Sequence, residues 1–440
     1  MRKILYIFLL FPFLASSQGI GNGIGSAPAD SISCDSLSYN SISCDSISCD
    51  SLSYDSISCD SIPVFSVREK IEKLLDSELI KTSQVGIMVY DLTSDSLLFA
   101  YNERQTLRPA STMKLLTAIT ALDHLGGDYQ FSTWLKYRGE IKDSQEEARL
   151  LIGDIIVKGG MDPKFSSDDM RAFVETLQKM RIDTIYGSII ADRSFKDTIM
   201  LGEGWCWDDK KPVLSPLLWN KKDTFLERFQ EQMAAAGIVV SDSIPEVLLA
   251  KEERPTFTTL LCTRHHTIEQ VLVKMMKESD NLFAEAVFYN ISANAMRPAT
   301  ARLSKKKMEE TIRRAGIIHS NYRIADGSGL SLYNYQTAEM QVALLKYAYR
   351  NSNIFESLYP SLPIAGIDGT LKKRMRKGPC LNNVRAKTGT LTGVSSLAGY
   401  LTNRSQHLIA FSIINQGVLR ASKAKAFQDA ICNILARSEE

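Results

Sequence analysis

The sequence has little excess of charge of either sign and little histidine. It contains 52 lysines and arginines against 50 aspartates and glutamates, a formal net charge of +2. This balance creates no long-range field that would attract nucleic acid or an anionic membrane. The 5 histidines are scattered apart from His265 and His266, and that pair has no metal-ligand partners at suitable spacing. We therefore expect no nucleic acid, no metal ion and no cofactor to be bound.

A long apolar run is also missing. The run from Ile4 to Leu14 follows Arg2 and Lys3 and is too short to anchor the chain in a bilayer. Basic residues, an apolar run and then small residues form the pattern of a signal peptide, which we place at 1–17. A buried N-terminal helix is the alternative. We expect an exported protein, periplasmic in location and at most peripheral to the membrane.

Four of the 8 cysteines fall in a serine-rich stretch of five-residue units such as DSISC and DSLSY, from Asp30 to Ile62. This period is too short for a solenoid repeat, so we predict a flexible spacer over 18–63, with β-pairing as the lesser alternative. The other four cysteines are widely spread. No disulfide pairing is predicted, because connectivity cannot be deduced from one sequence.

The rest of the chain predicts an α+β fold. A hairpin near one end, strands and a helix near the other, and helices between them favour a core built on an antiparallel sheet. The segment 129–249 differs from the rest of the chain in holding short strand-like pieces and one helix. We predict a smaller inserted α/β domain there, leaving 64–128 and 250–440 as the main domain. The core of the inserted domain is expected to include three tryptophans, Trp205, Trp207 and Trp219. The predicted elements are helices at 67–79, 167–180 and 423–437, strands at 154–158, 188–192 and 383–387, and hairpins at 85–102 and around 403–406.

Three short motifs occur in order along the chain. Ser-x-x-Lys spans Ser111–Lys114, Ser-x-Asn spans Ser279–Asn281, and Lys-Thr-Gly spans Lys387–Gly389. Each is weak alone, since chance also produces Ser-x-x-Lys at Ser304 and Ser422. Those two serines open charged helices, whereas Ser111 opens an apolar helix, and Lys-Thr-Gly occurs once, where we expect it to end a strand before a turn. The ordered set is therefore far more specific than its members.

The spacing gives this set a chemical meaning. Positions i and i+3 of a helix share a face, so the Lys114 amine can reach the Ser111 hydroxyl. A serine hydroxyl needs a base to become a good nucleophile, and a buried lysine near a second cation, here Lys387, has a lowered pKa that suits this task. Ser279 would relay the proton to the leaving amine, and Asn281 would hold Lys114 and the substrate amide. The backbone N–H groups of Ser111 and Thr390 would form an oxyanion hole.

The three motifs resemble those of penicillin-binding proteins and serine β-lactamases. Longer stretches such as RPASTMKLLTA, DGSGLSLYN and RAKTGTLTGVSSLAGY resemble the D-Ala-D-Ala carboxypeptidase/endopeptidases of peptidase family S13, from about residue 67 to the C-terminus. The resemblance implies a penicillin-binding fold, in which helices cover an antiparallel sheet. It also implies a two-step acyl transfer on peptidoglycan peptides that end in D-Ala-D-Ala or are cross-linked through D-Ala, with Ser111 as nucleophile. β-Lactam antibiotics would be captured covalently at the same serine.

The resemblance also suggests substrate contacts. Thr388, Gly389 and Thr390 would line the substrate and oxyanion site. Asp162 matches a position thought to touch the substrate, although a turn before a proline explains it equally well. There are two departures from the family: a further inserted domain is absent or much reduced, and Leu332 replaces a basic residue thought to bind the free end of the peptide's diamino acid.

Two other functions stay open. A serine β-lactamase would use the same acylation, but the long insertion between the first two motifs disfavours it, as does the lack of a convincing Glu-x-x-Asn loop. A non-catalytic penicillin-binding sensor is disfavoured because every motif residue is intact. For the turn-rich stretch from Asp326 to Gly329, we favour a structural loop beside the cleft over direct substrate contact.

Overall fold

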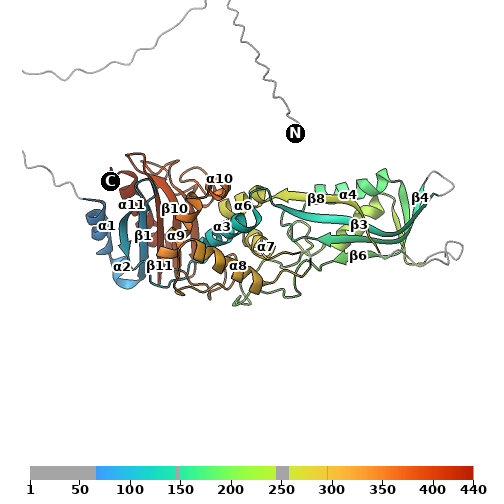
Figure 1. Cartoon of the computed structure of the whole chain (residues 1–440), viewed down its shortest axis with the longest axis horizontal. Coiled ribbons are helices and arrows are strands. Elements are labelled where there is room, and N and C mark those ends of the chain that lie inside the picture. The colour runs from blue at the N-terminus through green and yellow to red at the C-terminus, as the bar shows by residue number, and fades with distance from the viewer. Residues whose placement is uncertain (1–65, 144–147, 244–256, 295, 440) are drawn as a thin grey trace, which may run out of the picture. The chain divides into compact units, whose positions relative to one another are not determined.

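The structure of the chain, a computed structural model, describes residues 66–143, 148–243, 257–294 and 296–439. The expected signal peptide at 1–17 and the spacer at 18–63 lie outside the described residues. The described residues belong to one compact unit, Pro63–Glu440, which contains two β-sheets and the helices that cover them (Figure 1).

The first sheet has five antiparallel strands in the order β2-β1-β11-β10-β9. The predicted N-terminal hairpin is confirmed, and its strand β1 pairs along its whole length with β11 near the other end of the chain. Strands β10 and β11 are buried almost throughout, as expected for central strands with helices on both faces. The bounds are β1 (Gln84–Asp91), β2 (Ser96–Tyr101), β9 (Arg385–Leu391), β10 (Val394–Thr402) and β11 (Leu408–Gln416).

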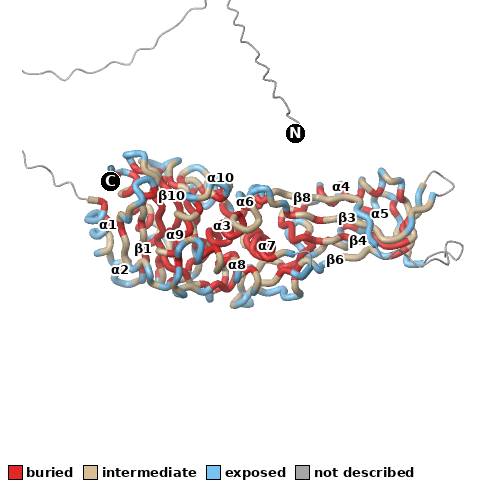
Figure 2. The backbone as a smooth tube through the Cα atoms, viewed as in Figure 1, coloured by how far each residue is buried: buried red, intermediate tan, exposed pale blue. Residues whose placement is uncertain are grey.

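Alternating side chains of this sheet enter two separate cores. Ile87 and Phe411 pack with helices α1 (Val67–Leu75) and α11 (Ala421–Ala436) on one face. Tyr400 and Ala410 pack on the other face with a larger set of helices, along which Figure 2 shows many buried residues. This set comprises α3 (Met113–Leu125), α6 (Ile268–Lys277), α7 (Asn281–Asn290), α8 (Ala301–Arg314), α9 (Ala338–Tyr349) and α10 (Ser352–Ser361).

The second sheet follows the order β7-β5-β4-β3-β8, with β6 paired to β4. Helices α4 (Ser167–Lys179) and α5 (Phe225–Ala235) cover one face through a cluster of phenylalanine rings. Strand β8 lies beyond 249 in the sequence, yet it pairs antiparallel with β3 of this sheet. The bounds are β3 (Gln130–Asp143), β4 (Arg149–Gly159), β5 (Ile182–Tyr186), β6 (Ile189–Asp192), β7 (Val239–Ser241) and β8 (Thr259–Thr267).

Three predictions of local structure are wrong. The helix expected at 67–79 is interrupted after Leu75, because Ser77 takes an extended backbone before a short helix, α2 (Glu78–Thr82). Of the three tryptophans assigned to the inserted domain's core, Trp207 is 89% exposed and Trp205 packs instead against the helices of the first sheet. The Lys-Thr-Gly motif lies within strand β9 and does not end it.

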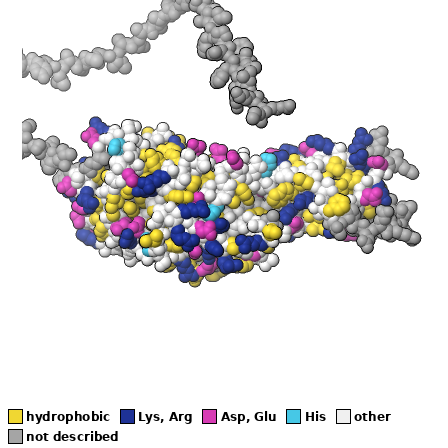
Figure 3. All heavy atoms as spheres, viewed as in Figure 1, with side chains coloured by type: hydrophobic (Ala, Val, Ile, Leu, Met, Phe, Trp, Pro, Cys, Tyr) yellow, Lys and Arg dark blue, Asp and Glu magenta, His cyan; other side chains and the backbone are white. Residues whose placement is uncertain are grey.

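Two general features of the described residues bear on partners. On the face shown in Figure 3, basic and acidic side chains are interspersed, as the small net charge predicts. Of the helices formed by the described residues, none has the length and apolar character needed to span a bilayer.

Candidate active site

The Ser111 turn is the starting point of the site. Ser111 lies in a 3-10 turn, η1 (Ala110–Thr112), that runs directly into the buried helix α3. Ala110 has a φ of 49°, a left-handed backbone that is unusual for alanine. Two hydroxyls fix this turn by donating to the Pro109 carbonyl, Ser396 Oγ at 2.6 Å and Thr112 Oγ1 at 2.7 Å. The turn therefore holds the Ser111 hydroxyl at the start of the helix, as the apolar pattern predicted.

Lys114 joins the first two motifs. Its Nζ donates to Ser111 Oγ at 3.0 Å, to Asn281 Oδ1 at 2.8 Å and to the Ser328 carbonyl at 2.7 Å. Burial lowers the pKa of the Lys114 amine to about 8, against the opposing charges of carboxylates led by Asp326. An amine with this pKa is partly neutral near pH 7 to 8, and a neutral amine beside a hydroxyl can accept its proton.

Lys387 joins the second and third motifs. Its Nζ donates to Ser279 Oγ at 2.8 Å and to the Thr388 carbonyl at 2.7 Å. Burial first, and then the charge of Lys114, lower the pKa of the Lys387 amine well below its ordinary value. Ser279 sits between α6 and α7 with a φ of 59°, so its backbone is strained in a way that often marks functional positions. The five motif side chains thus form two hydrogen-bonded groups, linked electrostatically through the two lysines.

Gly389 explains why the third motif contains glycine. A Cβ atom at this position would lie 2.1 Å from Ser396 Oγ, 2.7 Å from the Pro109 carbonyl oxygen and 3.0 Å from the Ser111 nitrogen. Strand β9 therefore packs directly against the Ser111 turn, which leaves no room for a side chain. The sequence suggested a turn at this glycine, whereas the structure requires it for close contact within a strand.

The other residues predicted to contact the substrate differ in how they are placed relative to the motif residues. Thr388 Oγ1 donates to Thr370 Oγ1 at 2.8 Å, and Thr390 is exposed on β9 opposite Ser395. Asp162 is 1% exposed, and its carboxylate accepts from the Lys164 nitrogen at 2.9 Å and contacts His266 Nδ1 at 2.7 Å. These bonds occupy both Asp162 oxygens, and no hydrogen bond within the described residues connects Asp162 to the five motif residues.

Leu332 has a basic neighbour from another part of the chain. Its carbonyl accepts from Arg108 Nε at 3.0 Å, and the Arg108 guanidinium lies 5.7 Å from the centre of the Tyr335 ring. A positive group is therefore present beside the position where the sequence lacks one.

The loop from Asp326 to Gly329 contributes more than its sequence suggested. The Ser328 carbonyl is one of the three acceptors around Lys114, so this structural loop also positions the amine. A Cβ atom at Gly329 would lie 1.9 Å from the Ala110 carbonyl oxygen, so the loop presses on the Ser111 turn. The DGSG sequence signals the turn, but only the fold brings its carbonyl to the lysine.

Two buried carboxyl groups hold this loop, and sequence reasoning missed both of these roles. Glu285 accepts from the Ser328 nitrogen at 2.9 Å, and burial together with Asp326 raises the pKa of the Glu285 carboxyl to about 8. Asp326 accepts from Trp205 Nε1 at 2.8 Å and from the Gly329 nitrogen at 2.7 Å. A lone glutamate in the apolar sequence LFAEAVF was the available signal for Glu285.

Comparison with known proteins identifies the family. The profile of the D-Ala-D-Ala carboxypeptidase 3 (S13) family matches residues 67–217 and 210–438, which is most of the chain. The chain belongs to this family. Among its relatives, the D-alanyl-D-alanine carboxypeptidase DacB of Haemophilus influenzae is 25% identical to this chain, over 77% of this chain and 86% of the relative's own length. The D-alanyl-D-alanine carboxypeptidase of an Actinomadura species is also 25% identical, over 84% of each chain.

Solved structures show the same fold. The crystal structure of penicillin-binding protein 4 from Haemophilus influenzae superposes with a TM-score of 0.73 at 23% identity, covering 84% of this S13 chain and 99% of that one. A structure of the same protein complexed with a β-lactam superposes with a TM-score of 0.67 at 24% identity, covering 84% of this chain and all of that one. The predicted α+β, penicillin-binding-type fold is therefore confirmed.

Proposed function

We propose that this S13 chain is a serine D-Ala-D-Ala carboxypeptidase and/or endopeptidase that acts on peptidoglycan stem peptides through an acyl-enzyme at Ser111. The observation that carries the proposal is the buried Lys114 amine, 3.0 Å from Ser111 Oγ and with its pKa lowered to about 8. The five motif residues lie within 64–128 and 250–440, and we propose these segments as the catalytic domain, apart from strand β8, and 129–249 as the insertion, to whose sheet β8 adds a strand.

Acylation would begin with proton transfer. Neutral Lys114 takes the proton of Ser111 as Oγ attacks the carbonyl carbon of the penultimate D-alanine. The resulting oxyanion would accept hydrogen bonds from the backbone N–H groups of Ser111 and Thr390, a contribution of about 3 kcal/mol for each donor. The C–N bond then breaks, and Ser279, bonded to Lys387, relays to the leaving amine the proton that Lys114 took, so that Lys114 is neutral again and Ser279 keeps its hydroxyl. Free D-alanine leaves when the peptide is not cross-linked.

Deacylation would restore the enzyme. Water attacks the ester carbonyl, the bond to Ser111 Oγ breaks, and the proton taken from water returns the serine to its hydroxyl form. When the leaving amine belongs to a second stem peptide, the same steps cut a cross-link, which is the endopeptidase reaction. The chemistry at the carbonyl does not distinguish the two reactions, so the peptide that supplies the amine decides between them.

β-Lactams would acylate Ser111 in the same way, but the reaction would stop at the acyl-enzyme. Attack by Ser111 opens the strained ring, but the amine stays tethered to the acyl group and blocks the approach of water. A serine β-lactamase is the alternative, and it would release hydrolysed drug quickly. These substrates place the protein outside the cytoplasm, and we propose a periplasmic location with at most peripheral membrane contact.

The test is D-alanine release from a synthetic N-acetylated peptide ending in Lys-D-Ala-D-Ala. Wild-type protein should release D-alanine, and Ser111→Ala should lower the rate by at least about 10³-fold, since the nucleophile is lost. The matched control is Ser422→Ala, which removes the exposed serine of another Ser-x-x-Lys sequence and should leave the rate unchanged. Equal activity of Ser111→Ala and wild type would reject the proposal.

A further inference from the structure

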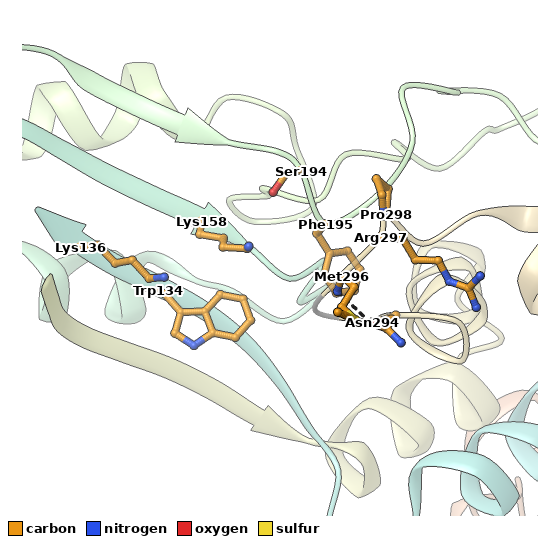
Figure 4. Close-up of a pocket in the computed structure, with 10 residues that line it drawn as sticks. Trp134, Lys136, Lys158, Ser194, Phe195, Asn294, Met296, Arg297 and Pro298 are labelled. Atoms are coloured by element: carbon orange, nitrogen blue, oxygen red, sulfur yellow. Dashed lines mark hydrogen bonds between the residues drawn. The ribbon is translucent and has the colours of Figure 1, made fainter. Parts of the chain in front are cut away.

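A separate pocket of about 510 Å³ lies on the second sheet, and none of the five motif residues lines it. Figure 4 shows Trp134, Lys136 and Lys158 of the sheet across from Phe195 and Met296, while the Arg297 guanidinium is directed away from the two lysines. This volume falls in the range of ordinary ligand pockets. The lining includes Trp134, Lys136, Lys158, Phe195, Met296 and Arg297.

The floor of the pocket follows from strand register. Trp134 and Lys136 are two residues apart on β3 and so point to the same face, and Lys158 of β4 lies directly opposite Trp134. The residue between them, Leu135, points to the other face and joins the core beneath α4 and α5. The pocket thus occupies the face of the sheet that these two helices leave uncovered.

The wall of the pocket comes from two connected segments. The Ala299 nitrogen donates to the Phe195 carbonyl at 2.8 Å, and this bond ties the segment before α8 to the segment after β6. Figure 4 shows Phe195 and Arg297 on these segments, across from the two lysines of the sheet. Main-chain hydrogen bonds therefore hold the two strands of the floor to each other and the two segments of the wall to each other.

Charge in the pocket is unbalanced. Lys158 lies 3.7 Å from Asp192, but Lys136 and Arg297 make no ion pair with any residue that the structure describes. Asp192 lies near both Lys158 and Lys136, so one carboxylate serves two lysines and the pocket keeps a net positive charge. Trp134 and the 93% exposed Met296 add an apolar surface beside the charges. The pocket therefore fits a ligand that combines carboxylates with an apolar face, such as the face of a sugar ring.

The position of the pocket relates it to the motif residues. Helix α7 begins at Asn281 of the second motif and ends at Asn290, four residues before Asn294 in the pocket wall. Ten helical residues extend about 15 Å. An extended peptide covers about 3.3 Å per residue, so a stem peptide of about five residues spans a comparable distance. One polymer could therefore occupy both places.

We propose that this pocket binds a second part of peptidoglycan, namely amino-sugar units and the carboxylates of the stem peptide they carry, while a neighbouring stem peptide reacts at Ser111. The proposal rests on the proposed function, because it extends the substrate of that site. The cations would hold the carboxylates, and Trp134 would stack on a sugar ring.

The test is sedimentation of the full chain with purified, insoluble peptidoglycan. Ser111→Ala serves as the background, so that the polymer is bound and not digested. Adding Lys136→Glu and Lys158→Glu should weaken binding by about 10-fold or more, and raising the salt concentration should weaken binding in the background but have little effect in this variant. The matched control is Lys70→Glu with Lys179→Glu, which makes the same charge change at exposed helical positions and should bind like the background.

Further arms separate this proposal from its rivals. Labelling with fluorescent penicillin, in chains that keep Ser111, reports folding and acylation of each variant, and the expected loss of polymer binding exceeds any loss of labelling. Failure of wild-type labelling would reject the proposed function but leave polymer binding as a separate readout. Equal binding of peptidoglycan by the pocket variant and the control would overturn the proposed pocket. A pocket variant that binds peptidoglycan like the background, but no longer binds anionic lipid vesicles or a partner protein, would overturn it as well.

Discussion

Raising the pH from about 6 to about 8 should increase the rate constant of acylation at Ser111 by about 50-fold. The reason is that Lys114 must be neutral to accept the Ser111 proton, and burial lowers the pKa of this amine to about 8. An amine with that pKa is about 1% neutral at pH 6 and about half neutral at pH 8. Above about pH 9 the rate constant should level off, because nearly all of the amine is then neutral.

The assay is the second-order rate constant of labelling by a fluorescent penicillin, measured by rapid quenching at each pH. The penicillin carboxylate stays ionised throughout, so the change in rate reports the enzyme. Lys114→Met is the control, because it has a similar length and no amine, and it should show a low rate that does not vary with pH. A wild-type rate constant that changes by less than about threefold over this range, in protein that stays folded, would refute Lys114 as the base.

Three further changes should act through contacts of the site. Gly389→Ala should slow penicillin labelling by about 100-fold, because the new methyl group would displace the Ser111 turn; labelling at the wild-type rate would contradict this. For Glu285, the raised pKa means that the unfolded state loses its proton from about pH 4.5 while the folded state keeps it until about pH 8, so wild-type stability falls across this window. Glu285→Gln lacks that slope, and its free energy of urea unfolding should gain a few kcal/mol relative to wild type between these limits; a constant difference would count against a buried neutral glutamate. Trp205→Phe removes the bond to Asp326 and should cost about 1.5 to 3 kcal/mol in urea unfolding, whereas a loss below about 0.5 kcal/mol would show that water replaces the bond.

Local patterns predicted much of this protein. The hairpin 85–102 consists of two apolar runs on either side of a polar turn at 93–96, and the helix after Ser111 carries leucines at helical spacing, so local patterns located both elements. The three motifs were recognised by order and context, and the structure joins their side chains through Lys114 and Lys387. The roles of these five residues in catalysis stay predictions until they are measured.

Other features depend on tertiary contacts that no local pattern encodes. Gly389 looked like part of a turn because glycine and threonine cluster there, whereas the approach of the Ser111 turn decides the residue. Glu285 would ordinarily be exposed, and only the packing of α7 against the loop at Asp326 makes it a buried, protonated acceptor. Trp205 belongs to a segment distant in sequence from that loop, and its hydrogen bond to Asp326 could not be read from either segment alone.

Specificity lies furthest from what the sequence can predict. Asp162 was matched to the substrate through resemblance, yet its carboxylate is occupied by His266 and by a main-chain nitrogen. Leu332 breaks the family pattern, while Arg108 brings a guanidinium to its carbonyl from another segment. Both findings concern which side chains are free to bind, and this depends on the contacts made after folding.

The most direct measurement is mass mapping of the protein after incubation with penicillin. The proposed mechanism predicts one covalent adduct per chain, located on the peptide that contains Ser111 and absent from Ser111→Ala. Its mass should equal that of intact drug added to the protein, because ring opening releases no leaving group. An adduct on any other residue, or a stable absence of adduct with D-alanine release intact, would contradict Ser111 as the nucleophile.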